Sequence, residues 1–485
     1  MIFKKRLEYP KSKTFEGEKV NVFAPFNKCP NPIRQRENSL SISGYFRFQI
    51  SNNELIPTSF SQRILVPFPI GSVLSEVNRT YSNKTYYHYH YMINSYENVK
   101  DRVFLVLTRT IGYHIIYING IKVYEGSSKI LEEVEITDQF RKDESNILDI
   151  TFKENKKEDF IGIAGQVYLD STPTDRIDDV VIRPSLKGRE VTVIIDSKRE
   201  SSYELTISSP SAMKTKYEFE GNRYTFKIKD YVEWDSAFPF FYQAEIKNKS
   251  GDTIKTLFSM HKYSVGKEDG IYCFKLNNKP FPIKGVMDSY LYTDGLIVPA
   301  STEHARYRVD MIKKYGFNSV RISNRLELPL YYYEAETRGL LVAQDINYSS
   351  KADLYEAIKY LSRFDSIFLI NINLKIKGIN IESLYNELKL IVPDKLITFT
   401  YKNNTTGDLY SFKKNKNNPS IILELKFKNK LEGLYDFMKN EYIPNSVNGM
   451  VGFFYSSYNS IDDGIMRPDE RKYRISVDDF KEIIE

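Results

Sequence analysis

The sequence predicts a multidomain protein made of a β jelly-roll sandwich, an immunoglobulin-like β-sandwich and a reduced (β/α)8 TIM barrel. The chain has 485 residues, which corresponds to roughly three domains at about 150 residues each. Its first half consists of short predicted strands separated by Asn-, Ser- and Gly-rich turns. From about residue 271, apolar strands alternate with segments of helical periodicity, the pattern typical of a parallel sheet with crossover helices.

Residues 1–172 are predicted to form the jelly roll, a domain similar to sugar-binding modules. The best-defined element is a β-hairpin over residues 113–126. Two alternating runs flank Asn119-Gly120, a pair that favours the positive φ angles of a two-residue hairpin turn. Other strands are predicted at 41–50, 85–92 and 102–108.

Residues 173–266 are predicted to form the smaller, immunoglobulin-like sandwich. Four evenly spaced strands are expected here, at 191–197, 203–209, 223–229 and 240–247. Trp234 is the only tryptophan of the chain and lies in this region. Because large aromatic side chains are usually buried, we expect Trp234 to pack in a core or between domains.

Residues 267–485 are predicted to form the barrel. The eight expected strands lie at 281–288, 319–323, 340–345, 366–372, 396–401, 408–412, 420–427 and 450–458. Amphipathic helices are predicted at 303–318, 352–364, 381–391 and 430–442, the first ending at Gly316. The links after strands five and six are too short for helices, so two helices of a complete barrel are missing. Active sites of this fold lie at the carboxyl ends of the strands.

The composition excludes several classes of protein. Lys plus Arg is 69 and Asp plus Glu is 63, so the net charge of +6 does not predict a nucleic-acid partner. Two cysteines without metal-type spacing predict neither a disulfide framework nor structural zinc, and no Walker or GxGxxG motif predicts a nucleotide cofactor. Neither a signal peptide nor an apolar run long enough for a membrane span is seen, which predicts a soluble, cytoplasmic protein. Aromatic residues reach 14%, but only one is Trp, and only five residues are His.

Several segments, in the same order along the chain, resemble glycoside hydrolase family 2, which includes β-galactosidases, β-glucuronidases and β-mannosidases. The similar segments are ILVPFPIGSVLS (64–75), YINGIKVYEG (117–126), GIAGQVYLD (162–170), the entry to barrel strands one to three, GDLYSF (407–412) and GFFYSSYNSIDDGIMRPDERKY (452–473). The resemblance implies retaining hydrolysis of a β-glycoside by two carboxylates about 5–5.5 Å apart, a nucleophile and a general acid/base.

The resemblance places the two catalytic positions at the ends of strands seven and four. Glu424 occupies the nucleophile position, although Leu425 and Lys426 follow it where the family has an aromatic residue and glycine. Without a catalytic role, Glu424 would be a strand-end carboxylate paired to a neighbouring lysine. The acid/base position falls on Lys375, and no Asp or Glu occurs from residue 366 to residue 380. Because the pKa of an ordinary lysine lies near 10.4, Lys375 is a poor proton donor at neutral pH.

The same resemblance implies substrate contacts by residues at other strand ends. Asp288, Arg321 and Asp345 match family positions, whereas Ala343 replaces a family tryptophan. Arg321 and Asp345 have an alternative role as an ion pair that braces the barrel rim. The remaining predicted substrate-binding residues are Asn324, Asn373, Tyr401 and Tyr455. No metal ion or other cofactor is expected, because the acid/base glutamate and the strand-two histidine are replaced.

Three functions remain open from the sequence. The first is a family member that binds carbohydrate but hydrolyses it weakly or not at all. The second is an active retaining exo-β-glycosidase that uses Glu424, with an acid such as Asp462 or Asp463 from another loop. The third is a structural or interaction protein without a carbohydrate ligand. A homo-oligomer is compatible with all three.

Overall fold

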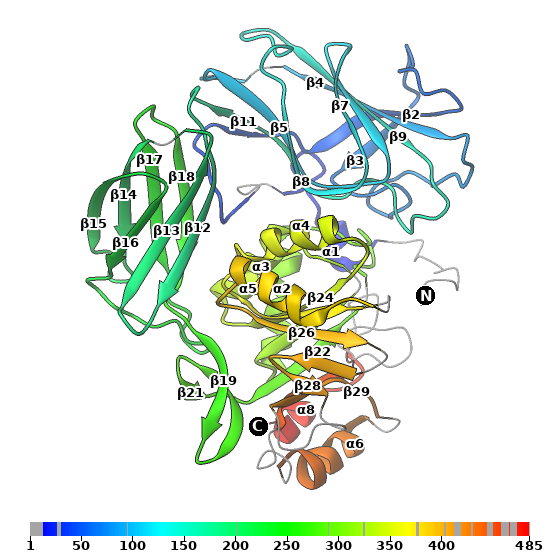
Figure 1. Ribbon diagram of the computed structural model, residues 1–485. Helices are drawn as coiled ribbons and strands as arrows, with labels where there is room; N and C mark the ends of the chain where they lie inside the picture. Colours follow the sequence, from blue (N-terminus) through cyan, green and yellow to red (C-terminus); the bar gives the residue numbers. More distant parts are fainter. Residues whose placement is uncertain are drawn as a thin grey trace.

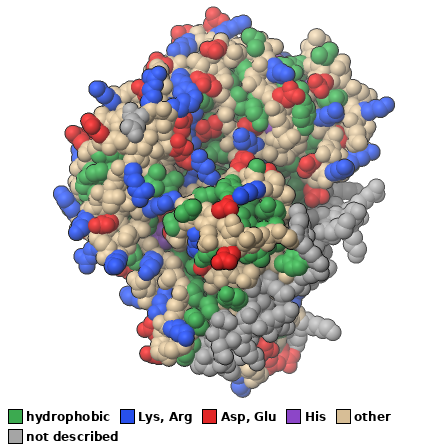
Figure 2. Space-filling view, viewed as in Figure 1, with side chains coloured by type: hydrophobic (Ala, Val, Ile, Leu, Met, Phe, Trp, Pro, Cys, Tyr) green, Lys and Arg blue, Asp and Glu red, His purple; other side chains and the backbone are tan. Residues whose placement is uncertain are grey.

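The computed structural model describes residues 13–26, 31–94, 96–199, 201–289, 291–323, 325–374, 378–401, 404–411, 419–427, 430–443, 450–456, 465 and 473–484. Figure 1 shows two groups of β-sheets beside a third region, in which helices surround a sheet. Positive and negative side chains are interspersed over the face in Figure 2, as the small net charge leads one to expect. No helix in these described segments is long and apolar enough to cross a membrane.

The first group is a sandwich of two antiparallel sheets. One sheet has the order β1-β11-β5-β10 with β8 added on β5, and the other has the order β3-β2-β4-β9-β6-β7. The predicted hairpin is confirmed, because Asn119 and Gly120 have φ values of 51° and 79° between β6 and β7. The bounds are β1 Ser39–Ser41, β2 Gly44–Ser51, β3 Gln62–Val66, β4 Tyr86–Ile93, β5 Arg102–Ile111, β6 His114–Ile118, β7 Ile121–Gly126, β8 Lys129–Glu135, β9 Asn146–Lys153, β10 Gly162–Ile163 and β11 Val167–Thr172, preceded by helix α1 Phe15–Glu18.

The second group is a smaller antiparallel sandwich with sheets β12-β13-β16 and β15-β14-β17-β18. A separate sheet, β19-β20-β21, links it to the third region, and β19 runs across the expected boundary at residue 266. The packing predicted for Trp234 is confirmed, because the ring is buried with residues of the third region and Nε1 donates to the Glu336 carbonyl at 3.3 Å. The bounds are β12 Ile177–Ser185, β13 Glu190–Ser197, β14 Ser202–Ser208, β15 Lys214–Glu220, β16 Arg223–Lys227, β17 Tyr242–Asn248, β18 Thr253–Phe258, β19 Tyr263–Glu268, β20 Ile271–Leu276 and β21 Lys279–Pro280.

The third region contains a mainly parallel sheet with the order β27-β26-β25-β24-β23-β22-β30-β29-β28. Each of the eight predicted strand segments overlaps one of its strands, with β24 and β25 ending one or two residues later than predicted, and β27 adds a short antiparallel strand. The two ends of the sheet meet, because Asp408 N donates to Ile397 O of β26 while Tyr410 N, at the start of β28, donates to Pro419 O beside β29. The bounds are β22 Ile283–Asp288, β23 Ser319–Ile322, β24 Leu341–Asn347, β25 Ile367–Asn373, β26 Leu396–Tyr401, β27 Asn404–Gly407, β28 Tyr410–Ser411, β29 Ser420–Leu425 and β30 Met450–Ser456.

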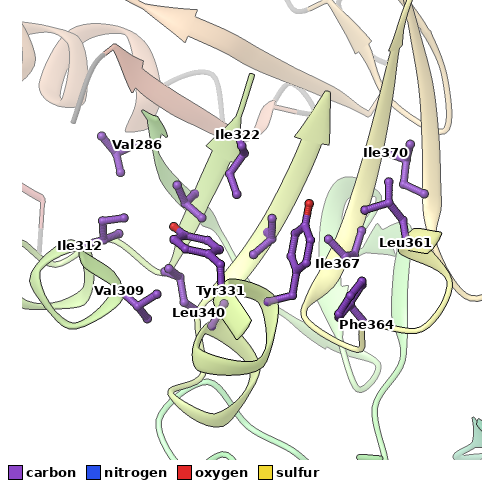
Figure 3. Close-up of a cluster of buried hydrophobic side chains, with 14 of the residues drawn as sticks. Val286, Val309, Ile312, Ile322, Tyr331, Leu340, Leu361, Phe364, Ile367 and Ile370 are labelled. Carbon is purple, nitrogen blue, oxygen red and sulfur yellow. The ribbon is translucent and has the colours of Figure 1, made fainter. Parts of the chain in front are cut away.

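Helices pack against this sheet and bury a continuous apolar core (Figure 3). The amphipathic helix predicted at 303–318 is α2, with Val309 and Ile312 buried on one face, and Gly316 follows it with a φ of 85°. The α3 helix was not predicted, because it is buried around most of its surface and lacks an amphipathic pattern. The bounds are α2 Thr302–Lys314, α3 Pro329–Thr337, α4 Lys351–Leu361, α5 Ile381–Ile391, α6 Lys430–Phe437, a π-helical turn η1 Met438–Tyr442 and α8 Val477–Ile484.

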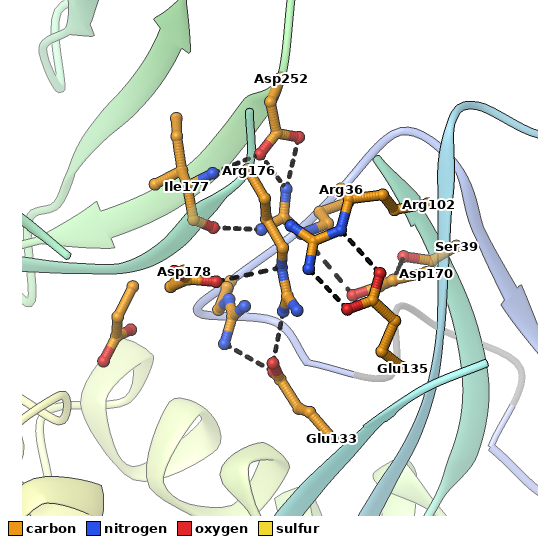
Figure 4. Close-up of polar contacts among 12 residues, drawn as sticks. Arg36, Ser39, Arg102, Glu133, Glu135, Asp170, Arg176, Ile177, Asp178 and Asp252 are labelled. Carbon is orange, nitrogen blue, oxygen red and sulfur yellow. Dashed lines mark hydrogen bonds and ion pairs between the residues drawn. The ribbon is translucent and has the colours of Figure 1, made fainter. Parts of the chain in front are cut away.

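Buried arginines connect the regions to one another (Figure 4). Arg36 precedes β1 and binds Asp252 of the second sandwich with contacts of 2.5 and 2.6 Å. Arg363, which follows α4, forms a two-pronged contact with Asp179 of β12 at 3.1 and 2.6 Å. Hydrogen bonds between arginine and carboxylate groups are short and strong, so these pairs help to set how the second sandwich sits against the other two regions.

Candidate functional site

Polar side chains gather at the carboxyl ends of the parallel strands. Arg321 of β23 donates to both carboxylate oxygens of Asp345 on β24, at 3.0 and 2.7 Å. Its third nitrogen, Nη1, donates to the Leu423 carbonyl of β29 at 2.5 Å. Because β22 and β30 lie between β23 and β29 in the sheet, this bond spans the interior enclosed by the strands. Arg321 therefore ties opposite sides of the site together.

Uncharged side chains continue this network along β24, β25 and β26. The buried Asn371 amide donates to Asp345 Oδ1 at 2.9 Å and to Asn373 Oδ1 at 3.2 Å, and Thr400 Oγ1 donates to Asn371 Oδ1 at 2.7 Å. Asn347, which is exposed, accepts from Asn373 at 3.5 Å. The structure thus brings the predicted residues Arg321, Asp345 and Asn373 together. Sequence reasoning missed Asn371 and Thr400, although alternate asparagines at the end of a predicted strand were a usable signal.

Glu424 lies on β29 at a local irregularity of the strand. Ile422 pairs with Phe453 and Leu425 pairs with Tyr455, so two residues of β29 face one of β30. Such bulges redirect side chains and are common next to functional sites. The Glu424 side chain is 45% exposed, forms an ion pair with Lys426 at 2.7 Å and accepts from Ser456 Oγ at 3.5 Å. Glu424 is thus paired with the lysine two residues further along the chain.

Asp288 lies beneath the strand ends instead of at an open surface. Its side chain is fully buried, and its Oδ2 contacts Arg308 at 3.2 Å and Arg325 at 3.1 Å. The Tyr292 ring lies 4.0 Å from the Arg308 guanidinium. This placement gives Asp288 the role of anchoring α2 and the segment after β23.

The two predicted tyrosines differ in their surroundings. Tyr455 is 1% exposed, and its ring packs edge-on against Phe480 of α8 with a centroid separation of 5.3 Å. Tyr401, at the end of β26, is partly buried against the core. Of these two, only Tyr401 retains exposed surface near the strand ends.

Several predicted residues lie outside the described part of the chain. These are Lys375 at the acid/base position, Asn324 after β23, and the alternative acids Asp462 and Asp463. Within the described part, no group of three or more His, Cys, Asp or Glu side chains is placed to hold a metal ion.

Known proteins resemble this chain in their solved structures. No family model matches the chain, and no curated protein matches it. A β-glucuronidase from an uncultured Clostridium species superposes with a TM-score of 0.74 at 15% identity, covering 93% of this chain and 98% of the other. A β-galacturonidase of glycoside hydrolase family 2 from Eisenbergiella tayi gives a TM-score of 0.70 at 13% identity, covering 95% and 98%. A family 2 member from Bacteroides cellulosilyticus gives 0.70 at 15% identity, covering 90% and 69%.

These similarities establish the fold. The chain has the multidomain architecture of these glycoside hydrolases along nearly its whole length. The expected likeness to the multidomain fold of glycoside hydrolase family 2 is therefore confirmed, in a chain whose identity to these proteins is only 13–15%.

Proposed function

We propose that this protein is a carbohydrate-binding member of glycoside hydrolase family 2 with impaired catalysis. The site would bind a β-glycoside at the carboxyl ends of the parallel strands. In this proposal residues 1–172 are a jelly roll, residues 173–266 an immunoglobulin-like sandwich and residues 267–485 a reduced (β/α)8 barrel. The likeness of the fold to glycoside hydrolases, together with the polar network at the strand ends, supports it.

The surroundings of Glu424 are the observation that carries the proposal. Retaining hydrolysis needs a second carboxyl group about 5–5.5 Å from the nucleophile. In the described part of the site, the contacts of Glu424 are with Lys426 and Ser456. The carboxylate of Asp345 is held by both prongs of Arg321, and the sequence has lysine at position 375. Loss of the acid/base group typically slows a protonation-dependent step by about 10²–10⁴-fold.

The proposed ligand contacts come from the network that remains. Arg321 and Asp345 would orient the polar groups of the site, and Asn373, with Asn371 beside it, would bind ligand hydroxyl groups. Tyr401 would offer a ring face to the sugar. Asn324 is also proposed as a contact, whereas the burial of Asp288 and Tyr455 favours supporting roles for those two residues.

A glycan array with the full-length protein tests the binding function. We expect β-glycosides to bind and Asn373→Ala to weaken that binding, with Asn94→Ala, at an exposed residue just after β4, as a control that leaves it unchanged. Absence of any glycan signal, together with an oligomer in size-exclusion chromatography with light scattering, would favour a structural protein. Labelling of Glu424 by a 2-deoxy-2-fluoro glycoside would instead favour an active retaining glycosidase.

A further inference from the structure

The segment that follows β23 is held at each of three successive carbonyl groups. The carbonyl of Arg325 accepts from Gln344 Nε2 at 2.7 Å. The carbonyl of Glu327 accepts from the Tyr360 hydroxyl of α4 at 2.8 Å. The carbonyl between them, that of Leu326, accepts from Arg109. A short segment fixed this tightly cannot shift without breaking several buried hydrogen bonds.

Side chains of the same segment are also locked. Arg325 Nε donates to Glu327 Oε1 at 2.6 Å, and Arg325 Nη2 donates to Asp288 Oδ2 at 3.1 Å. Arg325 is 8% exposed and Glu327 is fully buried. Gln344 Nε2, which holds the Arg325 carbonyl, also donates to the Ile322 carbonyl at the end of β23 at 3.2 Å, so the segment and the end of β23 share a buried partner next to Asp345.

Arg109 is the contact that comes from a different region. It lies on β5 of the first sandwich, is 6% exposed, and reaches the Leu326 carbonyl through Nη2. The backbone that leads into β11 runs close to Arg109, because Ala164 N donates to the Arg109 carbonyl at 3.1 Å. A Cβ atom at Gly165 would lie 2.8 Å from the Arg109 nitrogen and 2.3 Å from Thr108 Oγ1, so residue 165 must lack a side chain. The segment GIAGQ (162–166) therefore shapes the backbone that carries Arg109.

We propose that Arg109 is a positioning residue through which the first sandwich sets the geometry of the strand-end ligand site. A charged guanidinium buried against a carbonyl is a strong and directional contact. Arg109 does not touch the ligand in this proposal; it holds residues 325–327 and hence the end of β23. The inference rests on the proposed carbohydrate-binding function for its effect on affinity.

Hydrogen exchange measures the positioning directly and without a ligand. We expect Arg109→Met, which keeps the apolar stem, to raise amide exchange of residues 326–328 about tenfold. The matched control is Arg102→Met, on the same strand, whose guanidinium pairs with Glu135 at the surface. Arg109→Lys keeps the charge and is expected to restore part of the protection. Unchanged exchange in Arg109→Met would overturn the proposal.

Affinity for a saccharide identified on the array separates positioning from simple stabilisation. Binding is measured at a temperature well below the unfolding midpoints of the wild type and the variants. We expect Arg109→Met to weaken binding about five- to tenfold and Arg109→Lys to weaken it less. Faster exchange with unchanged affinity would show a purely structural role and overturn the proposal. Failure of the wild-type protein to bind any saccharide would instead overturn the proposed function, and the exchange experiment would then decide whether Arg109 fixes the segment.

Discussion

At the residue scale, the Arg321–Asp345 pair is the central contact of the strand ends. Both side chains are nearly buried and joined by two hydrogen bonds, and Arg321 also reaches the strand that carries Glu424. A buried ion pair of this kind contributes modestly as a pair, but removing one partner leaves an uncompensated charge in a low-dielectric setting.

Arg321→Met is therefore expected to lower the free energy of unfolding by about 3–5 kcal/mol. The double variant Arg321→Met with Asp345→Leu removes both charges and should recover part of that loss. Denaturant unfolding of the two variants and the wild type measures the difference. A double variant less stable than the single variant would contradict the account of an uncompensated carboxylate.

A second residue-scale prediction concerns Glu336 at the end of α3. Burial, with the nearby Asp365 carboxylate, raises the pKa of Glu336 well above its ordinary value of 4.5. The fold therefore favours the protonated form, and the associated stability is fully present below pH 4.5. It is lost as the pH rises from there toward the raised pKa of the folded state.

Glu336→Gln cannot ionise and should remove this pH dependence. We expect the variant to gain thermal stability relative to the wild type as the pH rises, with little difference at acid pH. Glu382→Gln, on the exposed first turn of α5, is the control. If the difference in unfolding temperature between the wild type and Glu336→Gln were the same at every pH, the raised pKa would be ruled out.

At the element scale, helices α2, α4 and α5 of the third region each begin at a residue whose side chain caps the first turn. Ser350 precedes α4, and its hydroxyl accepts from Asp353 N at 3.1 Å, satisfying one of the free N–H groups of the first turn. The preceding Ser349 donates to the Asp353 side chain at the surface instead. These neighbouring serines form a matched pair for testing the cap.

Ser350→Ala is expected to cost about 1 kcal/mol of unfolding free energy, because a cap hydrogen bond is lost. Ser349→Ala should change stability by less than about 0.5 kcal/mol, as is usual for an exposed polar contact. Chemical denaturation of both variants gives the comparison. Equal losses in the two variants would show that Ser350 does not act as a cap.

Much of the element structure was predictable because it depends on local patterns. Alternation and turn chemistry located the β6–β7 hairpin, and apolar runs located the eight strands of the third region. Helix α3 escaped prediction because Leu330 and Tyr332, which lie on nearly opposite sides of it, are both buried, so no polar face marks its period. Asp288 was predicted as a ligand contact, but its burial depends on Arg308 and Arg325, which are distant in the sequence.

At the scale of the whole molecule, charged contacts fasten the sandwiches to each other and to the third region. Asp252 is one of these points, because it binds Arg36 and also accepts from Ile177 N at 2.8 Å. Asp252 is 2% exposed and Arg36 is 6% exposed. The junction between the first and second sandwiches therefore depends on a buried ion pair.

Asp252→Ala is expected to destabilise the junction by up to about 3 kcal/mol, since the buried Arg36 would keep only the more distant Asp170 carboxylate, at 3.7 Å, as a counter-charge. Differential scanning calorimetry should show a lower first transition as the second sandwich loses its support. Lys255→Ala serves as a control, because Lys255 lies three residues further on, in β18, and its ion pairs with Glu37 and Glu245 are exposed. An unchanged calorimetric profile for Asp252→Ala would contradict the role given to this junction.

The central claim is that a glycoside hydrolase fold is kept while efficient hydrolysis is lost. The most direct test is the rate of p-nitrophenyl β-D-glucuronide hydrolysis by the wild-type protein compared with Glu424→Gln. We expect slow rates that do not differ between the two proteins, because Glu424 is paired to Lys426 and position 375 carries lysine. Rapid hydrolysis by the wild type that disappears in Glu424→Gln would contradict it.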